Sequence, residues 1–299
     1  MKKTIPIIKP VAMDEFHFGR ISDQLDFSKF HHLFHINKIE DFREKLTFPL
    51  PPHRKTLYDL IFLTKGSSIR SKGLNSYTIH QNQFFFLPAL QITSHEQMSE
   101  DAEGFFLHFS EELFVDVFHY LKPFSFLNFL AHPVVSIPND KLGPILSILH
   151  RLEELYRRIE KKDLSLVVWY LLALFNEVNN FADEGGKGAV KNSATHLTVQ
   201  YKNALTQHIY QKQTVQEYAE MLFVSPNHLN KCVKATTQKT AQKILNEMLI
   251  LEAKSLLKYS GYSVSEIAET LFGRTPSNFA RFFKNQTGLT PRQYLEERP

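Results

Sequence analysis

The first half of the chain alternates short apolar runs with turn signals, and this pattern predicts β-strands. The runs are rich in aromatic and β-branched residues, and they cover residues 57–64, 76–80, 83–87 and 105–109. Turn signals separate them roughly every ten residues between positions 16 and 135. Many short strands at this spacing predict a β-sandwich or a β-barrel.

Two longer apolar segments follow and predict helices. Residues 140–161 carry leucines at spacings of three, which is typical of an amphipathic helix. Residues 164–181 are nearly all apolar and include the only tryptophan of the chain. A helix of that composition must be buried, either against the β-rich half or against a second copy of the chain. The candidates for a dimer interface are Leu164, Trp169 and Leu172.

A Gly-rich polar segment over 183–193 has no hydrophobic periodicity, so it predicts a linker. We therefore expect one domain over 1–182 and a second, wholly helical domain over 194–299. Within the second domain, residues 241–259 form one long apolar-periodic segment that ends before Gly261.

The helical domain contains one pattern twice, because residues 214–223 return in similar form as residues 263–272. Each copy begins with a hydroxyl residue and has Glu three positions later, the capping box that starts a helix. Each has a small Ala on its apolar side and then reaches a second helix start, Ser225-Pro226 or Thr275-Pro276. Helix, tight turn and second helix predict a helix-turn-helix unit. Two such units in one domain predict a protein that reads two stretches of DNA.

Charge is unevenly distributed and supports a nucleic-acid partner for the helical domain alone. The net charge of the chain is +4. Residues 191–299 hold 14 Lys and Arg against 8 Asp and Glu, whereas residues 1–190 hold 21 against 23. The single cysteine, Cys232, excludes a disulfide framework and fits a reducing compartment. No segment has the pattern of a signal peptide or a membrane helix, so we expect a cytoplasmic protein without membrane contact.

The segment 197–297 resembles the DNA-binding domain of the arabinose-regulator (AraC/XylS) family of bacterial transcription factors. The resemblance is carried by Ser263-Val264-Ser265-Glu266-Ile267-Ala268, Phe279-Ala280-Arg281-Phe282-Phe283-Lys284, Thr287-Gly288-Leu289-Thr290-Pro291 and Tyr294. It implies seven helices, two helix-turn-helix units and a rigid connecting helix. The chain departs from the family at Phe272-Gly273, where Gly usually comes before Phe, and its first copy lacks the usual Phe-Lys pair.

In a helix-turn-helix unit the second helix lies in the major groove, and its exposed N-terminal residues reach base edges. Arg suits guanine, Asn suits adenine, and Lys suits a base or a phosphate. The expected base-reading residues are Asn227, Asn230, Lys231, Arg274, Ser277, Asn278 and Arg281. Hydroxyl groups, helix N-termini and ammonium groups bind phosphates, and the candidates for this role are Ser225, Thr275, Thr290 and Lys284.

The β-rich half resembles, more weakly, the family's effector-binding sensor, a cupin-like jelly roll. The strand rhythm, the turn at Gly66 and Phe86-Leu87-Pro88 carry this likeness. Metal-binding cupins need two or three His and a carboxylate. Because Gln91 replaces a usual His and no His-x-His occurs, we expect no metal and no cofactor. The pocket candidates, some placed by the family pattern, are Arg54, Tyr58, Lys65, Phe86, Gln91 and Phe106.

The fold class expected is thus α+β in two domains, a cupin-like jelly roll with two helices followed by an all-α double helix-turn-helix domain. The expected function is that of a dimeric regulator, by family resemblance more often an activator, with double-stranded DNA, a small effector and RNA polymerase as partners. It would be cytoplasmic and nucleoid-associated when bound, and not an enzyme. Two alternatives stay open: a barrel that only dimerises beside constitutive DNA binding, and a cupin enzyme with a DNA-binding tail.

Overall fold

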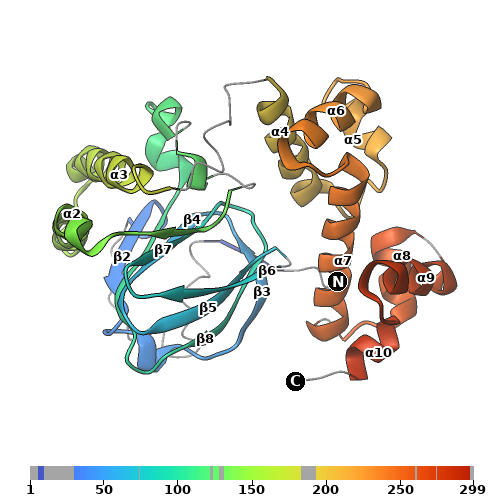
Figure 1. The fold of residues 1–299 in the computed structure, drawn as a ribbon, viewed down its shortest axis with the longest axis horizontal. Helices are drawn as coiled ribbons and strands as arrows, with labels where there is room; N and C mark the ends of the chain where they lie inside the picture. Colours follow the sequence, from blue (N-terminus) through green and yellow to red (C-terminus); the bar gives the residue numbers. More distant parts are fainter. Residues whose placement is uncertain are drawn as a thin grey trace. The chain divides into compact units, whose positions relative to one another are not determined.

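The structure, a computed structural model, describes residues 6–9, 30–73, 75–121, 124–127, 131–182, 193–259, 261–273 and 275–296. Contacts divide the chain into two compact units, one with Ile7–Gly188 and the other with Ala189–Pro299 (Figure 1). Residues 183–192, which make up almost all of the predicted linker, lie outside the described residues.

The first unit is built on two five-stranded sheets, in agreement with the predicted sandwich or barrel. One sheet has the order β1 (Ile7–Ile8), β3 (Leu50–Lys55), β8 (Thr93–Met98), β5 (Ser67–Lys72) and β6 (Asn75–His80). The other has the order β10 (Val134–Ser136), β7 (Gln83–Leu87), β4 (Tyr58–Lys65), β9 (Glu103–Phe109) and β2 (Phe34–Lys38). Among these described strands only β1 and β3 pair in parallel; the other pairs are antiparallel.

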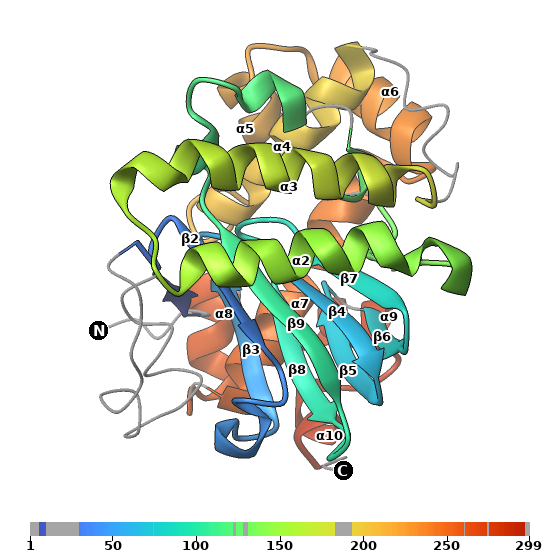
Figure 2. The same cartoon turned by 90° about the vertical axis from the view of Figure 1, so that its left-hand side faces the viewer.

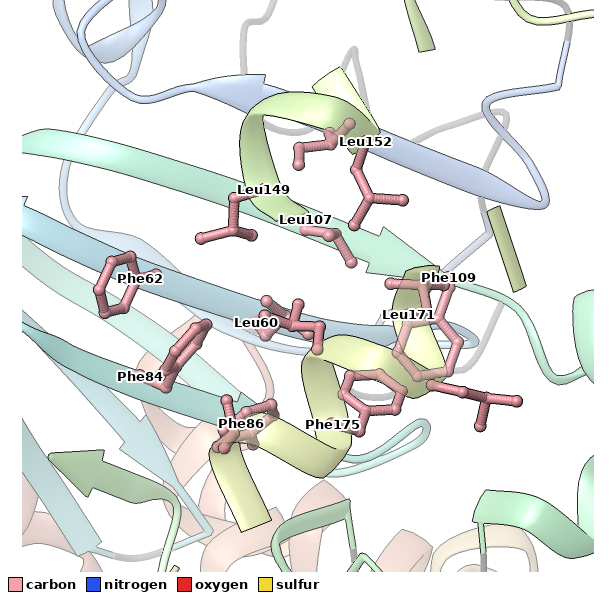
Figure 3. Close-up of a cluster of buried hydrophobic side chains, with 14 of the residues drawn as sticks. Leu60, Phe62, Phe84, Phe86, Leu107, Phe109, Leu149, Leu152, Leu171 and Phe175 are labelled. Atoms are coloured by element: carbon pink, nitrogen blue, oxygen red, sulfur yellow. The ribbon is translucent and has the colours of Figure 1, made fainter. Parts of the chain in front are cut away.

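Two helices, α2 (Leu142–Tyr156) and α3 (Leu164–Asn179), lie side by side across the second sheet (Figure 2). Alternate residues of β4, β7 and β9 point at them, because successive side chains of a strand face opposite sides of a sheet. Figure 3 shows this layer of the core, with Leu60, Phe62, Phe84, Phe86, Leu107 and Phe109 from the sheet and Leu149, Leu152, Leu171 and Phe175 from the helices. Each such buried side chain contributes about 1.5–3 kcal/mol to the stability of the unit.

The apolar composition of α3 is explained mainly by burial inside its own protomer. Leu172 is 7% exposed and belongs to the core beneath the helix, so its assignment to a dimer interface is wrong. Leu164 is partly buried against the same core. Trp169 differs from both, since it is 56% exposed, and Leu166 one turn earlier is 38% exposed. The outward side of α3 therefore keeps a narrow apolar strip.

The second unit contains seven α-helices among its described residues, the number that the family resemblance implied. They are α4 (Ser193–His208), α5 (Val215–Met221), α6 (Pro226–Thr237), α7 (Ala241–Tyr259), α8 (Val264–Phe272), α9 (Pro276–Thr287) and α10 (Pro291–Glu296). One continuous core includes side chains from both repeated copies and from α7 between them. Ala219 and Ala268 are fully buried in it, as expected for small residues where a second helix approaches closely.

Both predicted capping boxes are present at the starts of α5 and α8. The Thr214 hydroxyl accepts from the amide of Glu217 at 3.3 Å, and the Glu217 carboxylate accepts from the amide of Thr214 at 2.9 Å. Ser263 and Glu266 make the same reciprocal pair at 3.2 and 2.8 Å. These bonds satisfy amides that the first turn of a helix would otherwise leave unpaired.

Candidate nucleic-acid interface

The second helices of the two copies, α6 and α9, begin in the same way. The Ser225 hydroxyl accepts from the amide of His228 at 3.2 Å, and the Thr275 hydroxyl accepts from the amide of Asn278 at 3.4 Å. In both helices Pro occupies the first turn, where its missing N–H costs nothing. The hydroxyl protons of Ser225 and Thr275 remain available to donate to a phosphate oxygen.

Counted from these caps, the two helices present matching faces to solvent. The exposed pairs at equivalent positions are Asn227 and Ser277, His228 and Asn278, Lys231 and Arg281, and Lys234 and Lys284. Leu229 and Phe279, also equivalent, are both fully buried and hold the helices on the core. Neither α6 nor α9 contains Asp or Glu. Each helix thus shows an exposed face of polar and basic groups without a carboxylate to repel phosphates.

Asn230 does not belong to this face, and its assignment as a base-reading residue needs correction. Its Oδ1 accepts from the amide of Ala241 at 3.0 Å, so the side chain ties α6 to the start of α7. Bidentate recognition of adenine uses both the oxygen and the nitrogen of an Asn side chain. Because its oxygen is held by the Ala241 amide, the Asn230 side chain is directed toward the start of α7. Its equivalent in α9 is Ala280, which has no polar group.

The structure adds one residue to the predicted set, His228. Its side chain is exposed at the position equivalent to Asn278. Its Nε2 lies 3.7 Å from Sγ of Cys232, one turn further along α6. The sequence signal that identifies His228 is its position three residues after the Ser225 cap, which equals the position of Asn278 after the Thr275 cap.

Arg281 is exposed and already held by a neighbour on the same face. Its Nη2 donates to Oδ1 of Asn278 at 3.2 Å, one helical turn back. A guanidinium held by one partner keeps further N–H groups free to donate to a base or a phosphate. Lys231, the equivalent residue of α6, is exposed as well.

Of the two other predicted DNA contacts, Arg274 and Thr290, the structure describes only Thr290. Arg274 lies outside the described residues. Thr290 is half-buried, and its hydroxyl accepts from the amide of Gln293 at 3.2 Å at the start of α10. Its position before a helix N-terminus is compatible with the predicted phosphate contact.

The reversed order of Phe272 and Gly273 is accommodated by the turn of the second copy. Phe272 is buried, and its ring centroid lies 4.9 Å from that of Phe279 and 5.1 Å from that of Phe282. Gly273 then takes the left-handed conformation with φ of 54°. The equivalent residue of the first copy, two positions before Ser225, is Phe223, which has φ of 56° and is 96% exposed.

In the first unit, most of the predicted effector contacts do not reach the space between the two sheets. Phe86 and Tyr58 point to the other side of their sheet, toward α2 and α3. Lys65 lies at the surface, where its Nζ is 3.3 Å from a carboxylate oxygen of Glu103. Arg54 is buried, but strand alternation puts it on the opposite side of β3 from Lys55. These four assignments to a barrel pocket are therefore wrong.

The structure does not contradict the other two pocket candidates, Phe106 and Gln91. Phe106 lies on the inner side of β9, with its ring centroid 5.1 Å from Nζ of Lys55. Gln91 is 7% exposed, and its Oε1 has no hydrogen-bond partner within the described parts of the chain. Sequence reasoning missed the charged residues nearby, Lys55, Asp59 and Arg70, all of which are buried. A lone Asp inside an apolar strand was the available signal.

Histidines are numerous on the inner sides of the described strands. The rings of His35 and His108 stack at 4.8 Å, and His95 Nε2 is 2.7 Å from the Ser68 hydroxyl. Among the described residues, no group of three His, Cys, Asp or Glu side chains has the geometry to hold a metal ion. None of the described helices combines the length and the apolar character that a membrane span requires.

Comparison with known proteins shows which protein family the repeated helices match. Residues 218–297 match the family described as "Helix-turn-helix domain". Two relatives, both from Bacillus subtilis, are named as uncharacterized HTH-type transcriptional regulators. YobQ is 25% identical over 132 residues, which cover 40% of this chain and 54% of YobQ. YisR is 22% identical over 252 residues, which cover 80% of this chain and 85% of YisR.

The comparisons support the resemblance of the helical domain to the AraC/XylS family of transcriptional regulators. The family motif over 263–294 lies on α8, α9 and the start of α10, as the resemblance implied. A third relative, the uncharacterized transcriptional regulatory protein YesN of Bacillus subtilis, is 39% identical over 77 residues, which cover 25% of this chain but 21% of YesN. The match thus spans about half of YobQ and a fifth of YesN.

Among solved structures, ToxT from Vibrio cholerae aligns with a TM-score of 0.41 and 15% identity, over 88% of this chain and 98% of that chain. The C-terminal domain of AraT, a response regulator from Geobacillus stearothermophilus, aligns with a TM-score of 0.34 and 26% identity, over 36% of this chain and 89% of that chain.

Proposed function

We propose that this chain, which resembles the AraC/XylS family, is a sequence-specific regulator that reads two adjacent major-groove segments with α6 and α9. The observation that carries the proposal is the matching exposed face of the two helices, with Lys231 and Arg281 at equivalent positions and no carboxylate on either helix. Ser225 and Thr275 would fix the orientation on the DNA through phosphates, and the side chains beyond them would read bases.

Arg281→Ala should lower affinity for the specific site by about 1–3 kcal/mol, because Arg reads guanine through a bidentate contact. Binding to random DNA should fall much less. Fluorescence anisotropy with both DNA types, at one fixed salt concentration, measures the two losses. Arg151→Ala is the matched control, since it removes a partly exposed arginine from α2 in the other unit. Equal losses on specific and random DNA would reduce Arg281 to a phosphate contact.

The first unit would serve as effector-binding and dimerisation domain, and the protein would act in the cytoplasm as a homodimer that recruits RNA polymerase. Activation is the more common outcome in the family. The exposed strip on α3 supports the dimer, because Leu166 and Trp169 are apolar, exposed and one turn apart. Tyr120, 47% exposed, extends the strip, and its ring centroid lies 6.4 Å from that of Trp169.

Trp169→Glu should weaken this dimer about 30-fold or more, because a buried aromatic anchor is worth 2 kcal/mol or more at an interface. Sedimentation equilibrium of the full chain gives the dimer dissociation constant directly. Asn179→Glu is the matched control, since it adds the same charge at an exposed position at the end of α3. Unchanged dimerisation in the Trp169 variant would move the interface elsewhere. Leu172→Glu is unsuitable for this test, because its carboxylate would enter the core and unfold the unit.

Two further candidate functions give opposite results in simple measurements. If the first unit only dimerises, DNA binding will not respond to any small molecule. If the first unit is a cupin enzyme, the purified protein will contain stoichiometric iron, manganese or zinc. The described residues contain no group suited to hold a metal ion, and the named relatives are transcriptional regulators. We therefore propose a non-enzymatic regulator.

A further inference from the structure

Three charged side chains meet between the two sheets of the first unit. Asp59 comes from β4 in one sheet, and Lys55 and Arg70 come from β3 and β5 in the other. Nζ of Lys55 and Nη2 of Arg70 each lie 2.9 Å from the same Asp59 oxygen, Oδ2. All three residues are 2% exposed or less. Ion pairs this deep are costly to bury and therefore call for an explanation.

The cluster carries one more positive charge than negative. Burial alone would raise the pKa of the Asp59 carboxyl, but Lys55 and Arg70 outweigh burial and hold that pKa below its usual range. Burial lowers the pKa of the Lys55 ammonium to about 8, so Lys55 is still charged at neutral pH. Among the described residues, Asp59 is the only carboxylate that acts on Lys55. The surplus cation is thus uncompensated by the described protein.

Several polar atoms of the cluster also lack hydrogen bonds. Nε and Nη1 of Arg70 and Oδ1 of Asp59 are buried and have no hydrogen-bond partner among the described residues. Buried polar atoms are nearly always paired with protein, water or ligand. The unpaired set contains donors on a cation and an acceptor on the carboxylate beside it. A ligand that pairs with both groups and also neutralises the surplus charge has an anionic acceptor and a neutral donor.

One aromatic ring lies close to each of the two cations. The Arg70 guanidinium carbon lies 5.4 Å from the ring centroid of Phe85, and Nζ of Lys55 lies 5.1 Å from that of Phe106. Both rings belong to the sheet that carries Asp59. In such a water-poor environment an anion beside Arg70 interacts far more strongly than it would at the surface.

We propose that Arg70 and Asp59 form the recognition site for a small monocarboxylate that also carries a hydroxyl group. The planar guanidinium matches a carboxylate through paired N–H donors, and one negative charge neutralises the surplus of one. A dianion would leave a net negative charge buried in the same place. The ligand hydroxyl donates to Oδ1 of Asp59. The site gives a chemical class to the effector in the proposed function and rests on that function for its regulatory meaning.

The role of Arg70 can be separated from a purely structural one without any ligand. Arg70→Met removes the surplus charge and the unpaired donors but leaves Asp59 paired with Lys55. The variant should therefore melt no lower than the wild type. Asp59→Asn leaves two buried cations without a counter-charge and should melt far lower. Trp169 emission follows melting of this unit, because the chain has no other tryptophan.

Binding is tested on the full chain with sodium lactate and sodium gluconate, against lactamide and against sodium chloride at equal ionic strength. Either acid should raise Tm by about 5 °C near 100 times its Kd, and lactamide should not. The rise should vanish in Arg70→Met and weaken in Arg70→Lys, which keeps the charge but loses the planar fork. Lys65→Met, which removes an exposed lysine, should keep the full response.

The proposal is overturned if neither acid raises Tm, or if Arg70→Met lowers Tm as Asp59→Asn does. In that case water satisfies the cluster and its role is structural. If Arg70→Met does not fold, the Arg70→Lys response decides, and an undiminished rise there overturns the proposal. Operator affinity is measured separately: DNA binding without any carboxylate response refutes the site alone, whereas a Tm rise without DNA binding supports the site and refutes the proposed regulator.

Discussion

The β-rich unit should lose stability steeply as the pH falls below about 6.5, because it buries four neutral histidines. His35, His53, His95 and His108 are each 6% exposed or less. Burial lowers the pKa of His35 to about 4 and that of His53 to about 3. Burial likewise holds the pKa values of His95 and His108 well below the usual range.

The direction follows from proton binding in the two states. In the unfolded chain these histidines return to an ordinary pKa near 6.5 and take up protons below it, whereas the folded unit does not. Stability is therefore complete above about pH 6.5 and is lost between there and about pH 4. In this window each buried histidine lowers the free energy of unfolding by about 1.4 kcal/mol for each pH unit. The four histidines together therefore set an upper limit of about 5 kcal/mol for each pH unit. A unit with a typical 5–15 kcal/mol of stability should unfold near pH 5.

Urea titrations followed by Trp169 emission at about pH 7.5, 6.5 and 5.5 measure this slope. His108→Gln should reduce the slope by about 1.4 kcal/mol per pH unit, since one proton fewer binds on unfolding. His80→Gln is the matched control, because His80 is exposed on β6, and its slope should equal that of the wild type. A free energy of unfolding that stays constant down to about pH 5 would contradict the burial of neutral imidazoles.

The helical unit was predictable from the sequence because its signals are local. A capping box, a Pro in the first turn and a small Ala act within one or two turns of helix, so their spacing survives in the folded structure. The error at Asn230 has the same origin. Its residue type suits adenine, but its position, five after the Ser225 cap, turns it toward Ala241. The number of residues from the helix cap determines on which face of α6 a side chain lies, and the residue type does not.

The strands of the first unit were predictable, but their facing was not. In β4, Leu60 and Phe62 contact the helices while Ile61 and Leu63 face the other sheet. Because the sheet is covered on both sides, both sets are apolar and the usual alternation of polar and apolar residues disappears. Phe86 and Tyr58 were placed on the wrong side for this reason. Only a charged residue such as Asp59 marks the inner side of such a strand.

Composition alone also left open what covers α3. A nearly all-apolar helix must be covered, but the sequence does not say by what. The sheet covers most of it, including Leu172, and leaves only the strip with Leu166 and Trp169 exposed. Which residues of α3 are covered depends on the sheet beneath the helix. That sheet joins strands that are far apart in the sequence.

DNA binding should depend sharply on the spacing of the two segments, because one continuous helix fixes the distance between the two helix-turn-helix units. α7 has 19 residues and is thus about 28 Å long. Its start is held by Asn230, which accepts from the amide of Ala241, and by Tyr201, whose hydroxyl donates to the Ala241 carbonyl at 3.0 Å. Further along, Nζ of Lys254 lies 5.2 Å from the Tyr294 ring centroid. Both helix-turn-helix units share one hydrophobic core with α7. Neither helix-turn-helix unit can therefore reorient without disrupting that core.

Insertion of about 5 base pairs between the two segments of a selected site should lower affinity about 10²–10⁴-fold, because half a helical turn carries the second segment to the far side of the duplex. Insertion of about 10 base pairs restores the side but adds about 34 Å, which a rigid α7 cannot span, so affinity should remain low. Replacing the intervening base pairs without changing their number is the matched control and should have little effect. Recovery with the longer insertion would mean that the units move independently, and no loss with either insertion would mean that only one of α6 and α9 docks.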